Sequence, residues 1–185
     1  RAINLEMRED HPNFKTNIDN QLQYAPMVAV YGLNLLGVKS KNNFIDKTAI
    51  YFISNALMGM SVDFLKVKTH KLRPNGSGRA FPSGHTATAF VAAEFIRQEF
   101  IDVSPWYGFA GYTVATATGT LRMLKNAHWF SDVVAGAGIG ILTTRFTYFA
   151  YPLLKKGIQN NTHINMTITP TVYQGKPGIH VLFPL

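Results

Sequence analysis

The sequence predicts an all-α fold, a bundle of about five to six helices in a single domain over residues 1–185, with a short C-terminal β-like tail. Apolar residues make up 46% of the chain and charged residues only 15%, whereas soluble domains carry about 25% charged residues. Long apolar stretches alternate with short polar links that contain Pro or Gly, a pattern typical of helices joined by loops. The tail at about 163–185 is rich in strand-forming residues around a Gly-Lys-Pro-Gly turn, which predicts a short strand pair.

The first part of the chain predicts two helices. Residues 1–20 are polar and irregular, and residues 21–38 predict a helix that is interrupted near Pro26, because proline removes a backbone donor. After a polar link at 39–43, residues 44–66 predict a long helix whose apolar residues cover most of its circumference. Such a helix is normally central, so we expect it in the core.

Three more helices follow a basic loop. The stretch "THKLRPNGSGRAFPSG" contains two prolines and three glycines, which break any regular element. Residues 85–100 then predict a third helix. Ser104-Pro105 supplies an N-cap and a first-turn proline for a fourth helix that ends near residue 124. A fifth helix over 129–151 is expected to end at Pro152.

The last two predicted helices are rich in small residues. Glycine in a helix costs about 1 kcal/mol relative to alanine, so we expect close helix packing to compensate for it. The residues concerned are Ala115, Ala117, Gly119, Ala135, Gly136, Ala137, Gly138 and Gly140.

Two windows of 19 residues, 20–38 and 103–121, carry no charge. Both windows are diluted by Gln, Asn, Gly, Ser and Thr, whereas a clean membrane span is more apolar. We therefore predict buried helices of a bundle that rests on a membrane surface, with a membrane-spanning helix as the alternative.

The chain is basic, with 18 Lys and Arg against 10 Asp and Glu and a formal charge of +8. A basic excess indicates a phosphorylated substrate, an anionic lipid surface or a nucleic acid. Nucleic acid is disfavoured because the cations lack interleaved aromatic residues. The absence of cysteine excludes disulfides and thiolate metal sites. Seven cations crowd two segments: Lys66, Lys68, Lys71, Arg73, Arg79, Arg122 and Lys125.

The tetrapeptide Pro-Ser-Gly-His lies between the two basic segments. Pro82 and Gly84 break a helix and Ser83 is a good N-cap, so a helix is expected to begin at about His85. A helix start offers unpaired N–H groups and a partial positive charge, which suit an anion. Taken alone, the motif is at least as compatible with an ordinary cap followed by a surface histidine as with an anion-binding site.

The surrounding residues meet the needs of phosphate chemistry. A phosphate ester carries about two negative charges, so several fixed cations must hold it, and Lys66, Arg73 and Arg122 are candidates. His128 and Asp132 are four residues apart and share one helix face. The carboxylate is then placed to accept a hydrogen bond from one imidazole nitrogen while the other stays basic. Two histidines, one oriented by an acid, suit displacement at phosphorus through a covalent intermediate.

These residues form three motifs: "KVKTHKLRP" (66–74), "PSGH" (82–85) and "LRMLKNAHWFSD" (121–132). With them the sequence resembles the type 2 phosphatidic acid phosphatase superfamily, which also contains bacterial acid phosphatases and vanadium haloperoxidases. The signature of that family is Lys-x6-Arg-Pro, Pro-Ser-Gly-His and Ser-Arg-x5-His-x3-Asp, and ten fixed positions match over residues 66–132. Two features depart from it: Leu121 replaces the serine, and only seven residues separate the first two motifs.

The resemblance implies a role for each matched residue. His128 would be the nucleophile that forms a phosphohistidine, and Asp132 would hold its tautomer. His85 would protonate the leaving alcohol and then activate water. The phosphate oxygens would be held by three cations and by backbone N–H groups at the helix start, namely Lys66, Arg73, Arg122, Ser83 and Gly84. No metal or other cofactor is needed, because the cations stabilise the charge. We expect the four unmatched cations, Lys68, Lys71, Arg79 and Lys125, to form a solvated rim that attracts the substrate.

We therefore predict a metal-independent phosphatase that acts on a phosphomonoester or diphosphate of a lipid-linked substrate at an anionic membrane surface. A vanadate-dependent haloperoxidase shares the same pocket, but little chain remains here to build a halide site. A non-catalytic module that binds phosphate or anionic lipid would need only the cations, and not the histidines and Asp132. The expected location is the bacterial cell envelope, periplasmic or membrane-associated, with export directed by residues that precede Arg1.

Overall fold

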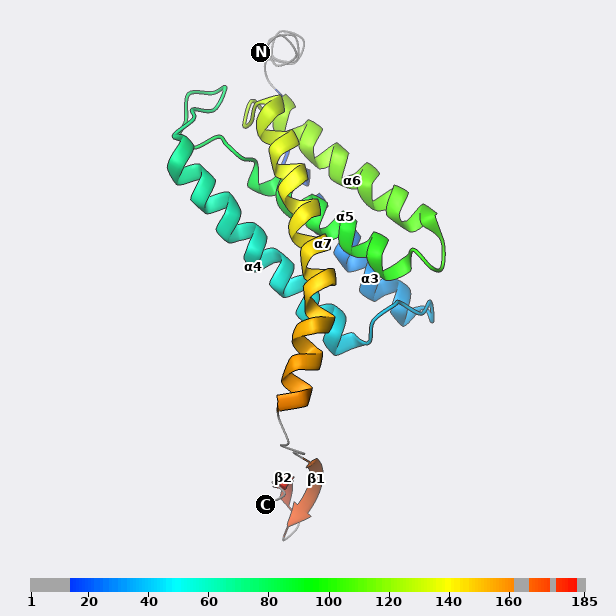
Figure 1. Cartoon of the computed structure of the whole chain (residues 1–185). Coiled ribbons are helices and arrows are strands. Elements are labelled where there is room, and N and C mark those ends of the chain that lie inside the picture. Colours follow the sequence, from blue (N-terminus) through cyan, green and yellow to red (C-terminus); the bar gives the residue numbers. More distant parts are fainter. Residues whose placement is uncertain (1–13, 162–166, 174–175, 183–185) are drawn as a thin grey trace. The chain divides into compact units, whose positions relative to one another are not determined.

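The computed structural model describes residues 14–161, 167–173 and 176–182 of the chain (Figure 1). Its helices are α2 (Ile18–Leu22), α3 (Ala25–Leu35), α4 (Phe44–Thr69), α5 (Gly84–Phe100), α6 (Pro105–Leu124) and α7 (Phe130–Asn161). Strands β1 (Thr167–Tyr173) and β2 (Lys176–Leu182) pair antiparallel, with Thr167 opposite Leu182. The predicted all-α class is confirmed, and the strands lie where the sequence predicts the β-like tail.

The chain forms two compact units, residues 1–148 and residues 149–185. Every residue of the candidate site lies in the first unit. The organisation of the whole chain as a single domain remains a prediction.

The predicted interruption near Pro26 is confirmed. α2 ends at Leu22 and α3 begins at Ala25. Pro26 occupies the first turn of α3, where the missing backbone N–H costs no helical hydrogen bond. The chain leaves α3 through Gly37, whose φ of +88° is accessible to glycine.

α4 is not the central helix that the sequence predicts. Its start is capped by Asn43, whose side-chain oxygen accepts the N–H of Asp46 at 2.9 Å. Five large apolar side chains on α4 are each more than 60% exposed: Phe44, Ile45, Phe52, Met60 and Phe64. A helix that is apolar all round belongs either in a protein core or in a membrane, and its sequence alone does not distinguish the two.

α5 is the buried centre of the first unit. α3, α4 and α6 all pack against it, and Figure 1 shows it between α4 and α6. The core cluster combines residues of α5 with residues of α3 and α4, namely Ala87, Val91, Ala92, Phe95, Ile96 and Phe100 with Val30, Tyr51, Met58 and Val62. The helix that begins at Pro-Ser-Gly-His is therefore held on several sides.

Two buried glutamates of α5 tie it to α7. Glu94 accepts a hydrogen bond from Arg145 Nε at 3.0 Å, and Glu99 accepts one from the Tyr148 hydroxyl at 2.6 Å. An unpaired buried carboxylate is costly, so these contacts fix the two helices relative to each other. Glu94 and Glu99 lie about 15 Å or more along α5 from Gly84, the first residue of the helix.

α7 continues past Pro152, where the sequence predicts its end. Pro152 lies inside the helix, which reaches Asn161. A proline within a helix costs about 3 kcal/mol, but it is followed by Leu153, Leu154, Lys155 and Lys156, which are strong helix formers. The favourable sequence after the proline accounts for the longer helix.

Glycines of α7 allow it to approach α5 closely, as the small residues predict. A Cβ at Gly136 would stand 2.5 Å from the carbonyl oxygen of Ser83, and one at Gly140 would stand 2.4 Å from that of Ala87. Neither backbone atom is able to move away without moving α5. By contrast, no atom of the described residues lies within 4 Å of a Cβ at Gly138.

Gly136→Ala is therefore expected to lower the free energy of unfolding by about 1–3 kcal/mol, because the added methyl group overpacks the α5–α7 contact. Gly138→Ala is the matched control, and it should be neutral or stabilise the helix by up to about 1 kcal/mol. Thermal or denaturant unfolding in detergent would measure both. Equal stability of the two variants would contradict the close approach of the helices.

Candidate active site

The residues of the three motifs come together at one end of the first unit. The loops that join α4 to α5 and α6 to α7 lie at this end (Figure 1). Lys66 is in the last turn of α4, and Arg122 is in the last turn of α6. His85 is in the first turn of α5, Asp132 is in the first turn of α7, and His128 lies in the loop before it.

Direct contacts join the motifs. An ideal Cβ on Gly84 would stand 3.5 Å from Lys66 Nζ, so the lysine amine lies beside the Pro-Ser-Gly-His turn. The side chain of Ser83 caps α5 by accepting the N–H of Thr86 at 3.4 Å. The backbone N–H of Ser83 donates to the backbone carbonyl of Asp132 at 2.9 Å. The expectation that this N–H binds phosphate is therefore wrong, because the contact between α5 and α7 already uses it.

Two arginines of the cluster carry buried donors without an acceptor. Within the described part of the chain, the Nε atoms of Arg73 and Arg122 are buried and make no hydrogen bond. Both arginines are also within electrostatic range of Lys66. A buried unsatisfied donor costs about 1–3 kcal/mol, and mutual repulsion adds to this cost. An anion among these side chains would relieve both.

His128 is buried and held by a backbone carbonyl. Its Nδ1 lies 2.8 Å from the carbonyl oxygen of Ala80, and because that oxygen only accepts, Nδ1 carries the proton. Burial lowers the pKa of His128, and its interaction with Asp132 offsets only part of that effect. The imidazole is therefore neutral at pH 7, with its basic lone pair on Nε2.

Asp132 is shared among several partners. Its carboxylate accepts the N–H of Trp129 at 2.9 Å, which caps the start of α7, and pairs with Lys71 at 2.5 Å. The distance from its Oδ2 to Nδ1 of His128 is 3.8 Å, longer than a hydrogen bond. Lys71 thus contacts a residue of the site directly, and its assignment to a solvated rim is wrong.

His85 faces α2. Its Nε2 lies 3.0 Å from the side-chain oxygen of Asn20, which accepts a hydrogen bond from the ring N–H. Burial, followed by the positive charge of Arg122, lowers the pKa of His85 to about 4. A bound phosphate dianion would counter that charge and raise the pKa of His85 towards its ordinary value.

Asp19 of α2 is a site residue that the sequence does not reveal. Its buried carboxylate accepts Nη1 of Arg122 at 2.6 Å and Nζ of Lys125 at 2.9 Å. Burial acts to raise the pKa of Asp19, but the hydrogen bonds from Lys125 and Arg122 outweigh it and hold the pKa below its usual range. Lys125 is therefore ion-paired, and its assignment to a solvated rim is also wrong. No spacing signal connects residues that are about a hundred positions apart.

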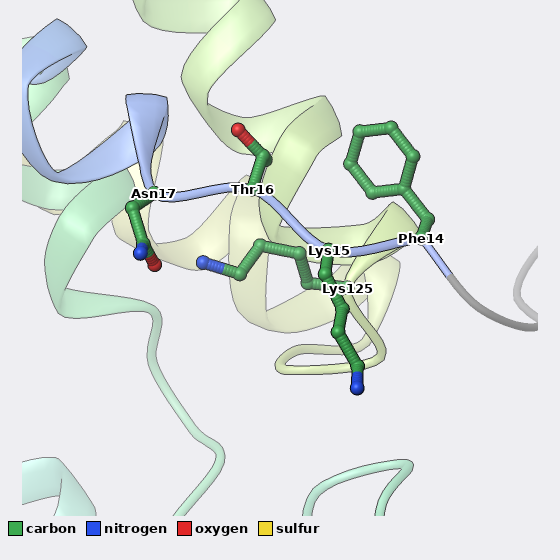
Figure 2. Close-up of a pocket in the computed structure, with 5 residues that line it drawn as sticks. All are labelled: Phe14, Lys15, Thr16, Asn17 and Lys125. Atoms are coloured by element: carbon green, nitrogen blue, oxygen red, sulfur yellow. The ribbon is translucent and has the colours of Figure 1, made fainter.

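A pocket of about 380 Å³ lies next to this ion pair. Figure 2 shows its lining, which consists of the segment that leads into α2 and one lysine after α6: Phe14, Lys15, Thr16, Asn17 and Lys125. A phenyl ring and two amines offer a ligand both apolar contact and positive charge. Through Lys125 and Asp19, the pocket borders the cation cluster.

A family model described as the PAP2 superfamily matches residues 66–156, which supports the resemblance drawn from the motifs. A lipid A 1-phosphatase of Porphyromonas gingivalis is 40% identical over 144 residues, which cover 77% of this chain and 32% of that protein. The chain thus spans about a third of the length of this curated relative.

Two solved structures share the fold. Aquifex aeolicus LpxE superposes with a TM-score of 0.60 at 23% identity, covering 80% of this chain and 96% of that one. A transmembrane PAP2-type phosphatidylglycerolphosphate phosphatase from Bacillus subtilis superposes with a TM-score of 0.52 at 15% identity, covering 88% of this chain and 87% of that one. At these identities the two structures support the helical fold and nothing finer.

Proposed function

Because residues 66–156 of this chain form a PAP2 superfamily domain, we propose that the protein is a metal-independent phosphatase that hydrolyses a phosphomonoester or diphosphate of a lipid. One observation carries the proposal. Among the described residues, the buried Nε atoms of Arg73 and Arg122 have no acceptor, and they lie in the same cluster as two histidines with lowered pKa values. A phosphoryl group would satisfy the donors and lie beside both imidazoles.

The proposed reaction has two steps. Nε2 of His128 attacks phosphorus and the bond to the leaving oxygen breaks, while His85 protonates that oxygen. His85 then accepts a proton from water, which attacks the phosphohistidine and releases phosphate and free His128. Lys66, Arg73 and Arg122 would balance the charge on the phosphoryl oxygens throughout.

The nature of the substrate is supported by the relative that is a lipid A 1-phosphatase. Lipid A is therefore the first substrate to test, together with phosphatidic acid, phosphatidylglycerol phosphate, undecaprenyl diphosphate and a small soluble ester. Phosphate release in detergent micelles should be fastest for a lipid-linked phosphate. Hydrolysis of the soluble ester alone would contradict the lipid assignment, and no release from any substrate would contradict the activity.

Phosphatase activity is expected to survive EDTA, because three cationic side chains take the charge-stabilising role that a metal plays elsewhere. Vanadate should inhibit competitively, because it adopts the five-coordinate geometry of the transition state. Initial rates with and without each reagent would test both. Loss of activity with EDTA that Mg²⁺ or Zn²⁺ restores would contradict the metal-free mechanism.

The membrane setting is supported by α4 and α7. Each contains an 18-residue window with a mean hydropathy of 1.3, of which only 28% and 22%, respectively, is buried. Like α4, α7 exposes large apolar side chains, including Val134, Leu142 and Phe146. Apolar surface of this extent marks a membrane or an interaction site. The sequence predicts a bundle that rests on the membrane surface. We propose instead that both helices cross the membrane of a bacterial envelope, with the site at the membrane surface.

The protein should accordingly stay with membranes through a high-salt wash and dissolve only in detergent. An 18-residue apolar helix covers about 27 Å, close to the hydrocarbon thickness of about 30 Å. A protein held by its charge of +8 alone would be released by salt, which screens the attraction. Fractionation followed by immunoblotting would distinguish the two, and release by salt would restore the peripheral interpretation.

A further inference from the structure

Asp19 joins the candidate phosphate site to a helix outside the matched region. It lies on α2, whereas the family match begins at residue 66. Its side chain is fully buried, and both carboxylate oxygens are used. Oδ2 accepts Nη1 of Arg122 at 2.6 Å, and Oδ1 and Oδ2 accept Nζ of Lys125 at 2.9 and 3.1 Å.

This contact holds one side of the Arg122 guanidinium and leaves another donor for a ligand. The guanidinium presents its N–H groups in a rigid planar fork. Nη1 is bound to Asp19, whereas Nε is buried without an acceptor among the residues described. Because the group is rigid, fixing Nη1 also fixes the direction in which Nε donates.

The same contact extends to the predicted nucleophile. The backbone carbonyl of Arg122 accepts the N–H groups of Ala127 at 3.1 Å and of His128 at 3.3 Å. The end of α6 therefore determines where His128 lies. Asp19 anchors that end through two side chains, those of Arg122 and Lys125.

We propose that Asp19 is a positioning residue of the site, which orients the Arg122 guanidinium towards the phosphoryl group and holds the turn that carries His128. This inference rests on the proposed phosphatase function and adds to it a residue from α2. Asn20, the next residue of that helix, contacts His85, so α2 contacts both the phosphate-binding and the acid–base sides of the site.

Two other roles for Asp19 predict that phosphate binds more tightly when its carboxylate is removed. If α2 only covers the site, removing the ion pair would open it and phosphate would bind more tightly. If Asp19 acts only through its negative charge, removing that charge would raise the positive potential and again tighten binding. Positioning predicts weaker phosphate binding in spite of the added positive charge.

Asp19→Asn in the full chain tests these roles, since it keeps the size of the side chain and removes its charge. The matched control is Asp102→Asn, which removes an exposed carboxylate after α5. Two measurements are made: kcat and KM for phosphate release from lipid A micelles, and thermal stabilisation by inorganic phosphate.

Asp19→Asn should lower kcat/KM by about 10- to 100-fold, as loss of an outer-shell partner does elsewhere, and weaken phosphate binding. Asp102→Asn should match wild type, and unchanged or tighter phosphate binding in Asp19→Asn would overturn the proposal.

Further variants keep the test decisive. In an Arg122→Gln background, Asp19→Asn should lower kcat/KM little further, because the effects of coupled residues are not additive. A full further loss of kcat/KM would contradict an action through Arg122.

If Asp19→Asn does not fold, Asp19→Glu keeps the charge but shifts the carboxylate by one methylene. It should lower kcat/KM at an unchanged melting temperature, and a wild-type kcat/KM would overturn the proposal. Wild-type protein without phosphatase activity would contradict the proposed function alone, because the phosphate-binding measurement still tests Asp19.

Discussion

His128→Ala is expected to abolish phosphate release, with a loss of at least about 10⁴-fold in kcat, the scale seen when a catalytic unit loses its nucleophile. Without the imidazole, no covalent intermediate forms, and only the cations remain to stabilise charge. The side chain is 2% exposed and donates to the carbonyl of Ala80, so the alanine variant also loses a structural hydrogen bond. His128→Asn keeps an N–H donor at a similar position and separates loss of chemistry from loss of fold.

Rapid-quench labelling with a radiolabelled substrate would test the nucleophile directly. The wild-type protein should incorporate phosphate in an acid-labile, base-stable form typical of phosphohistidine, and neither His128 variant should be labelled. His180→Ala, which alters a histidine of β2, should label as wild type does. Acid-stable label on an Asp or Ser side chain would contradict the assignment of His128.

Features that depend on local chemistry could be predicted from the sequence. Ser104 caps α6 and Ser83 caps α5, at the positions that their side chains favour. The three motifs could be matched because each one is a short, contiguous spacing. The end of α4 and the start of α5 follow from the prolines and glycines of the loop between them, whereas the loop between α6 and α7 contains neither residue.

Features that depend on tertiary contacts could not be predicted. The exposure of α4 depends on which of its apolar faces meets protein, and a sequence that is apolar all round does not specify that face. Asp19 pairs with Arg122 although about a hundred residues separate them in the sequence, and no periodicity links the two residues. The sequence places Lys71 between the matched Lys66 and Arg73, within the first motif. Its pairing with Asp132 depends on the fold and could not be predicted.

Replacing the Asp132 carboxylate should give the second largest loss of kcat, after the replacement of His128. Asp132→Asn is expected to lower kcat by about 10²- to 10³-fold with little change in KM, because the nearby carboxylate stabilises positive charge on the imidazole of His128, while the carbonyl of Ala80 still holds the proton on Nδ1. The asparagine retains an oxygen that can accept the N–H of Trp129, a contact now made at 2.9 Å. The cap of α7 should therefore survive, and the variant should remain folded.

The ion pair with Lys71 offers a comparison that isolates the role of the carboxylate. Lys71→Met removes the 2.5 Å pair with Asp132 but leaves the carboxylate beside His128. If Asp132 serves His128, Asp132→Asn should lose far more kcat than Lys71→Met, whose carboxylate gains freedom to turn towards the imidazole. If Asp132 serves only to hold the loop through Lys71, the two variants should lose kcat equally. Steady-state kinetics on both, with unfolding transitions to verify their folds, would decide between these roles, because only loss of the carboxylate removes the charge that stabilises an imidazolium at His128.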